Sequence, residues 1–67
     1  MLKIAELKLD YQMVRKYAKY NQKDWSKKLG VTHITVSNWE HNKTKPSFEQ
    51  VRIMSELSGV PLENIKD

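Results

Sequence analysis

The fold of this 67-residue chain is decided by residues 21–47, NQKDWSKKLGVTHITVSNWEHNKTKPS. Asn21 and Thr32 are residue types that cap helix N-termini well, and Gly30 suits the left-handed position that ends a helix. One helix then fits residues 22–29 and another fits residues 33–41. We therefore predict two short helices joined by a tight turn.

Apolar residues within this stretch recur at helical spacing. Trp25 and Leu29 face one way on the first helix, and Val36 and Trp39 lie on one side of the second. The second helix is otherwise rich in β-branched residues, which are poor helix formers. Its residues therefore suit a function of the helix surface better than they suit helix formation. Two short helices joined by a tight turn with glycine form a helix-turn-helix unit, which we assign to about residues 21–41.

Another helix is predicted before this unit, over residues 9–20. Asp10 can cap it. Its apolar stripe consists of Tyr11, Val14 and Ala18. The same spacing continues backwards through Ile4 and Leu7. Residues 1–9 are therefore either an extension of this helix or an extended N-terminal arm, and the sequence leaves both open.

The C-terminal third carries its own helix signals. Ser47 and Gln50 have the spacing of a capping box, and Gly59 suits the end of the helix that it would start. Residues 60–65, with Pro61 in the first turn, suit a last short helix. We therefore predict an all-α protein, a compact bundle of about five short helices with one domain over residues 10–67.

Composition excludes several classes of function. The chain has no cysteine and two histidines, so it has no thiolate and too few ligands for a metal site. No nucleophile is spaced to pair with a base, so we expect no enzyme and no cofactor. No apolar run approaches the roughly 20 residues of a membrane span, and the N-terminus is not a signal peptide. We expect a cytoplasmic protein with no membrane partner.

Charge is distributed unevenly along the chain. Residues 1–45 carry ten Lys and Arg against four Asp and Glu, whereas residues 46–67 carry two against four. A basic front and a slightly acidic back suggest one face that meets a polyanion, although a generic charged surface would look similar.

The decisive stretch also matches a known family pattern. Its pattern NQxxWSxxLGVTxxxVSxWExNxxxPS resembles the Cro/phage-repressor-type helix-turn-helix family, also called XRE-like, and the resemblance covers roughly residues 10–65. The resemblance implies a lambda-repressor-like DNA-binding domain of five helices that usually acts as a dimer on a pseudo-palindromic operator. It also implies a transcription regulator, of the repressor kind, in a bacterial or phage-infected cell.

Five positions depart from the family pattern. Ser26 stands where the family often has Ala, and it should fit if its hydroxyl bonds back to the preceding turn. Asn42 stands where Gly is usual, and Asn tolerates a left-handed turn. Ser58 stands where Leu is usual, while Ile53 and Leu57 are apolar where the family is often polar. The sequence therefore leaves open which residues of that helix face the core.

The resemblance places the N-terminal part of the helix over residues 33–41 in the DNA major groove. The predicted base-reading residues, on the face opposite the core positions, are His33, Ile34, Ser37 and Asn38. Asn38 can pair with adenine, and Ile34 can meet a thymine methyl group. His33 and Ser37 can reach base edges or phosphate. The competing interpretation is an ordinary solvated helix face.

Other residues are predicted to contact DNA phosphates. The helix that begins at Gln22 offers backbone N–H groups and a positive dipole end. Lys43 and Lys45 lie in the loop where the family contacts the DNA backbone. The predicted phosphate set is Asn21, Gln22, Thr32, Lys43 and Lys45. The competing interpretation is plain helix caps and solvated lysines.

The resemblance also implies an ion pair between Arg15 and Glu40, at the positions of a recurring bridge in the family. The planar guanidinium suits a bidentate grip on a carboxylate. If the pair is exposed, it contributes little to stability; if it is buried, breaking it from one side is costly.

A protein interface is predicted in the C-terminal half, where more apolar residues occur than a monomer's core requires. Its residues are Ile53, Leu57, Val60 and Leu62. The partner would be a second copy on DNA. Alternatively, Ile53 and Leu57 fill the core in place of the missing Leu. The alternative function is a protein-binding antirepressor or antitoxin that acts by complexing a repressor or toxin.

Overall fold

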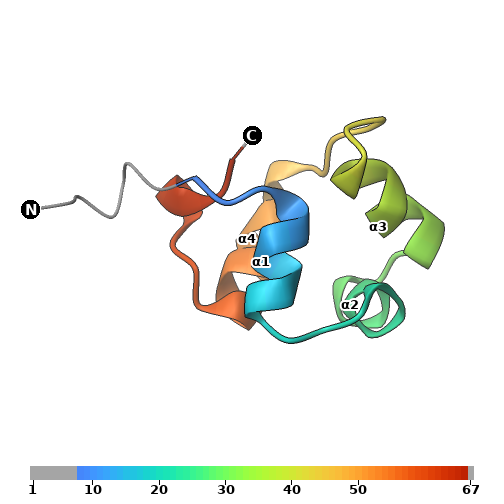
Figure 1. Ribbon diagram of the computed structural model, residues 1–67, viewed down its shortest axis with the longest axis horizontal. Helices are drawn as coiled ribbons and strands as arrows, with labels where there is room; N and C mark the ends of the chain where they lie inside the picture. The colour runs from blue at the N-terminus through green and yellow to red at the C-terminus, as the bar shows by residue number, and fades with distance from the viewer. Residues whose placement is uncertain (1–7, 67) are drawn as a thin grey trace, which may run out of the picture.

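The computed structural model describes residues 8–66, and within them the chain folds into four α-helices (Figure 1). These are α1 (Tyr11–Tyr17), α2 (Gln22–Leu29), α3 (His33–Glu40) and α4 (Phe48–Ser58). The predicted all-α class is confirmed, but the count of about five helices is wrong. The last predicted helix is only the short 3-10 helix Leu62–Asn64, with Pro61 as its N-cap, and the chain is already extended at Ile65, which pairs with Leu9.

Each α-helix begins where a capping side chain accepts a backbone hydrogen bond. Asn21 Oδ1 accepts from the backbone N–H of Asp24 at 2.7 Å, and Ser47 Oγ accepts from that of Gln50 at 3.3 Å. The four capping residues, all with extended backbone, are Asp10, Asn21, Thr32 and Ser47. α2 and α4 end at Gly30 and Gly59, whose φ angles of 72° and 80° favour glycine.

The start of the described chain is extended. Leu9 pairs with Ile65 in a parallel β-bridge, and the backbone N–H of Lys66 donates to the carbonyl of Leu9 at 2.8 Å. Because Asp10 is an extended N-cap, the helical stripe does not continue backwards through residues 8–10. The choice between an arm and a helix extension for residues 1–9 as a whole stays a prediction, because residues 1–7 lie outside the described part of the chain. The predicted positions Ile4 and Leu7 lie outside the described residues.

α1 is shorter than predicted at its C-terminal end as well. It stops at Tyr17, and the chain then turns through Lys19, whose φ is 66°. The Tyr20 ring lies 5.2 Å from that of Trp25, measured between centroids, so the turn is packed against α2.

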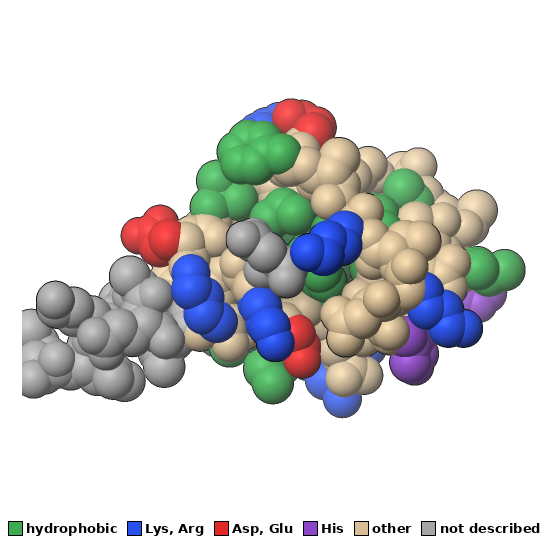
Figure 2. All heavy atoms as spheres, turned by 90° about the horizontal axis from the view of Figure 1, so that it is seen from above, with side chains coloured by type: hydrophobic (Ala, Val, Ile, Leu, Met, Phe, Trp, Pro, Cys, Tyr) green, Lys and Arg blue, Asp and Glu red, His purple; other side chains and the backbone are tan. Residues whose placement is uncertain are grey.

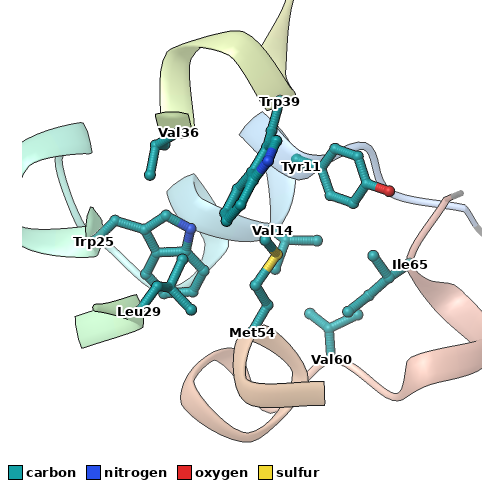
Figure 3. Packing of buried hydrophobic residues seen from close by; sticks show 9 residues of the cluster. All are labelled: Tyr11, Val14, Trp25, Leu29, Val36, Trp39, Met54, Val60 and Ile65. Carbon is teal, nitrogen blue, oxygen red and sulfur yellow. The ribbon is translucent and has the colours of Figure 1, made fainter. Parts of the chain in front are cut away.

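A single hydrophobic core joins all four α-helices (Figure 3). Trp25 and Leu29 enter it from α2 and Val36 and Trp39 from α3, while Met54 reaches from α4 towards α1. The two tryptophans are 1% and 5% exposed, so they are core residues and not stacking platforms for bases. The buried hydrophobic residues are Tyr11, Val14, Trp25, Leu29, Val36, Trp39, Met54, Val60 and Ile65.

Polar substitutions in the family pattern are accommodated by local hydrogen bonds. Ser26 is buried between helices, and its hydroxyl donates to the carbonyl of Lys23 at 2.6 Å, as expected. Ser58 accepts from the backbone N–H of Val60 at 3.1 Å and so helps to end α4. Ile53 and Leu57 are half-buried and pack against the core, with Met54 as the buried residue of α4.

We predict that Met54→Ala destabilises the domain by about 2–5 kcal/mol, because it leaves a cavity where the side chain is fully buried. The free energy of unfolding is measured by urea titration followed by circular dichroism. Met13→Ala is the matched control, because Met13 is 51% exposed and its truncation should change stability little. Equal effects of the two substitutions would contradict the described core.

Candidate nucleic-acid interface

α3 has one anchored face and one outward face. Val36 and Trp39 are 1% and 5% exposed and fix the helix to the core. Outside them, His33 and Ile34 are exposed, the latter at 63%. Ser37 and Asn38 are half-buried. The structure thus keeps all four predicted base-reading residues out of the buried core.

The C-terminal end of α3 contains a contact that sequence reasoning missed. His41 Nδ1 lies 2.8 Å from the backbone carbonyl oxygen of Ser37 and 3.3 Å from its hydroxyl. The spacing of four residues on a helix is the signal that would have suggested it. Ser37 therefore presents a hydroxyl that already has a neighbour on its own helix.

Arg15 and Glu40 form a bidentate ion pair that joins α1 to α3. Arg15 Nε lies 2.7 Å from Glu40 Oε2, and a second guanidinium nitrogen lies 3.2 Å from Glu40 Oε1. The side chains are only 10% and 3% exposed. A further nitrogen of Arg15 donates to the carbonyl of Tyr20 at 2.9 Å, so the pair also holds the turn between α1 and α2.

Gln22 adds α2 to this network. Its side-chain amide donates to Glu40 Oε1 at 3.0 Å, and the residue is half-buried. Sequence reasoning assigned Gln22 only to phosphate and missed this contact. Because a glutamine amide carries two N–H groups, the contact with Glu40 orients the side chain at the start of α2 and leaves a second donor. The arrangement fixes where the N-terminus of α2 points relative to α3.

The other predicted phosphate residues lie on exposed caps and in an exposed loop. Asn21 and Thr32 cap α2 and α3 and are exposed. Lys43 and Lys45 are exposed in the loop between α3 and α4. The loop leaves α3 through Asn42, whose φ of 60° confirms the expected left-handed turn. The backbone N–H of Lys43 then donates to the carbonyl of Asn38 at 2.9 Å, which ties the loop to α3.

The four residues of the predicted protein interface differ in how accessible they are in the structure. Val60 is buried at 5% exposure, so its side chain is removed from that surface. Its carbonyl accepts from the hydroxyl of Ser55 at 2.6 Å, which holds this part of the chain against α4. Ile53 and Leu57 are half-buried against the core, as in the alternative that the sequence left open. Leu62, at 36% exposure, remains accessible.

Two further features are absent from the described part of the chain. It contains no group of three His, Cys, Asp or Glu residues placed to hold a metal ion. None of its helices is both long enough and apolar enough to span a membrane.

A model of the helix-turn-helix family matches residues 12–65, nearly the whole chain. The chain therefore belongs to the helix-turn-helix family, in its XRE and Cro-type branch, whose members are DNA-binding regulatory domains. No curated protein and no solved structure gives a significant match to it.

We predict that Glu40→Gln lowers stability by about 3–5 kcal/mol, because it leaves the buried guanidinium of Arg15 without a counter-charge. Thermal unfolding by calorimetry measures the loss. Glu56→Gln is the matched control, since Glu56 pairs with Arg52 on the surface and is 64% exposed. A Glu40→Gln variant that melts with the parent would show that the pair contributes nothing.

Proposed function

We propose that this protein is a sequence-specific double-stranded DNA-binding regulator of transcription, similar to phage Cro and repressor proteins. It acts in the cytoplasm of a bacterium or a phage-infected host cell. The observation that carries the proposal is α3, a helix fixed by Val36 and Trp39 whose other face is open. Family membership supports the same function.

In this proposal the N-terminal part of α3 enters the major groove and reads base edges. Asn38 pairs with adenine through its side-chain amide, and Ile34 packs against a thymine methyl group. His33 and Ser37 contact base edges or nearby phosphates. The rigid attachment of α3 to the core supports this role, because a helix that reads bases must keep a fixed orientation.

Phosphate contacts set the position of α3 on the duplex. At the start of α2, backbone N–H groups and the side chains of Asn21 and Gln22 face one DNA strand, and Thr32 adds a contact at the start of α3. Lys43 and Lys45 contact the backbone from the loop after α3. The contact of Gln22 with Glu40 supports its assignment, because it holds the amide in a fixed place.

One copy of α3 covers only a few base pairs, so we propose that two copies bind a pseudo-palindromic operator. Helix-turn-helix dimers place their two reading helices on half-sites about one helical turn, roughly 34 Å, apart. The alternative function, an antirepressor or antitoxin that complexes another regulator or a toxin, would give a stable heterocomplex and no affinity for DNA.

Base reading is tested first. A duplex recovered by selection from a random DNA pool serves as the probe. On it, Asn38→Ala is expected to cost about 1–3 kcal/mol and to relax preference at one base position, because one bidentate contact is lost. Affinities are measured by fluorescence anisotropy on the selected duplex and on its scrambled counterpart. An equal loss on both duplexes would show that Asn38 does not read a base.

Phosphate contact is tested by salt dependence. Lys43→Ala is expected to weaken binding on every sequence and to reduce the slope of log affinity against log salt by about one, since one counterion fewer is released. Lys16→Ala, an exposed lysine of α1, is the matched control and should leave the slope near that of the parent. A Lys43→Ala variant with the parent's slope would remove Lys43 from the interface.

A further inference from the structure

The turn between α1 and α2 contains a lysine in an unfavourable backbone conformation. The φ of Lys19 is 66°, in the left-handed region where a Cβ is unfavourable and glycine is the usual residue. The two glycines of the chain, Gly30 and Gly59, hold the matching positions after α2 and α4. Asn42 also has a positive φ, but asparagine tolerates it. Lysine is therefore the exception among the described residues with this conformation.

The way in which α1 ends requires this conformation. The backbone N–H of Lys19 donates to the carbonyl of Lys16 at 3.0 Å, and that of Tyr20 donates to the carbonyl of Arg15 at 3.2 Å. These two bonds form the helix end at which glycine is most common. The ring of Tyr20 packs against that of Trp25, so the turn cannot relax without disturbing its contact with α2.

The charge of Lys19 has no use inside the described structure. Lys19 is exposed, and within residues 8–66 its ammonium group has no ion pair and no hydrogen bond. The last turn of α1 already contains Arg15 and Lys16, which suit the negative end of the helix dipole. Figure 2 shows lysine or arginine side chains at several separate places on one face, so an exposed cation is ordinary here. The backbone conformation is what distinguishes Lys19.

We propose that Lys19 contacts a DNA phosphate on the strand that meets the start of α2. This inference rests on the proposed function, in which Asn21 and Gln22 face that strand. Lys19 lies two residues before Asn21, the cap of α2. Two residues span at most about 7 Å, and the flexible four-carbon stem of lysine extends the reach further. The phosphates next to those at Asn21 and Gln22 are therefore within reach of the ammonium group.

The turn has a fixed place relative to the helix that is proposed to read bases. The carbonyl of Tyr20 accepts a hydrogen bond from Arg15 at 2.9 Å, and the same guanidinium is paired with Glu40 of α3. In Figure 1 the chain passes from this turn into α2, which lies beside α3. A charge on the residue before Tyr20 can therefore help to set the position of α3 on the duplex, as phosphate contacts do.

The test uses two substitutions that remove the charge and suit a left-handed residue, Lys19→Gly and Lys19→Asn. Lys19→Gly is expected to raise the melting temperature by about 4 °C, because it relieves the backbone conformation. Lys19→Asn is expected not to lower it. Both should weaken binding to the selected duplex and to its scrambled counterpart by the same factor. Both should also reduce the slope of log affinity against log salt by about one, because one counterion fewer is released.

Two control variants separate contact from net charge. Lys28→Gln removes a positive charge in the last turn of α2, at the other end of that helix from Gln22, and should keep the parent's slope. Lys19→Arg keeps the charge and should keep the slope as well. Melting temperatures are measured by circular dichroism and affinities by fluorescence anisotropy over a range of salt concentrations.

A parent-like slope in folded Lys19→Gly and Lys19→Asn would overturn the inference. An equal fall in Lys28→Gln would overturn it too, because net charge alone would then explain the loss. A Lys19→Gly variant that is less stable and has the parent's slope would assign the lysine to the end of α1 instead. Failure of the parent itself to bind any duplex is a separate outcome, which would refute the proposed function and this inference with it.

Discussion

The carboxylate of Glu40 is the group on which the arrangement of the helices depends. It accepts hydrogen bonds from Arg15 of α1 and Gln22 of α2 while belonging to α3 itself. A carboxylate that is 3% exposed requires partners, because an unpaired charge in that place would be costly. Three helices are therefore held in one relative orientation by a single side chain. In a domain of this size the core is small, so this network adds a constraint on helix orientation to what the core supplies.

This constraint connects stability to the proposed reading of DNA. α2 and α3 pack closely, and their caps and exposed faces must meet the duplex together for phosphate and base contacts to form in register. The carboxylate fixes this geometry from inside, while Val36 and Trp39 fix it from the core. Polar groups that are exposed on α3 can then be exchanged for others without disturbing the fold, which is how one scaffold can serve different DNA sequences.

Much of the fold could be predicted from the sequence because the signals that begin and end its helices are local. Asn21, Thr32 and Ser47 cap helices, and Gly30 ends one, through contacts with residues close by in the chain. The pairing of Leu9 with Ile65 could not be predicted, because it joins residues from opposite ends of the chain. The contact of Gln22 with Glu40 was missed for the same reason, since it forms only after α2 and α3 are packed. The burial of Val60 follows from the turn after α4, where Ser55 and Ser58 bond to its backbone.

In the proposed function, the outward face of α3 is the surface that meets DNA. Its most direct test is a titration of the ¹⁵N-labelled chain with a selected duplex, followed by the chemical shifts of the backbone amides. The largest changes are expected at the start of α3, at Asn21 and Gln22, and in the loop with Lys43 and Lys45. Amides of α3 that stay unchanged while the duplex is bound would contradict the account.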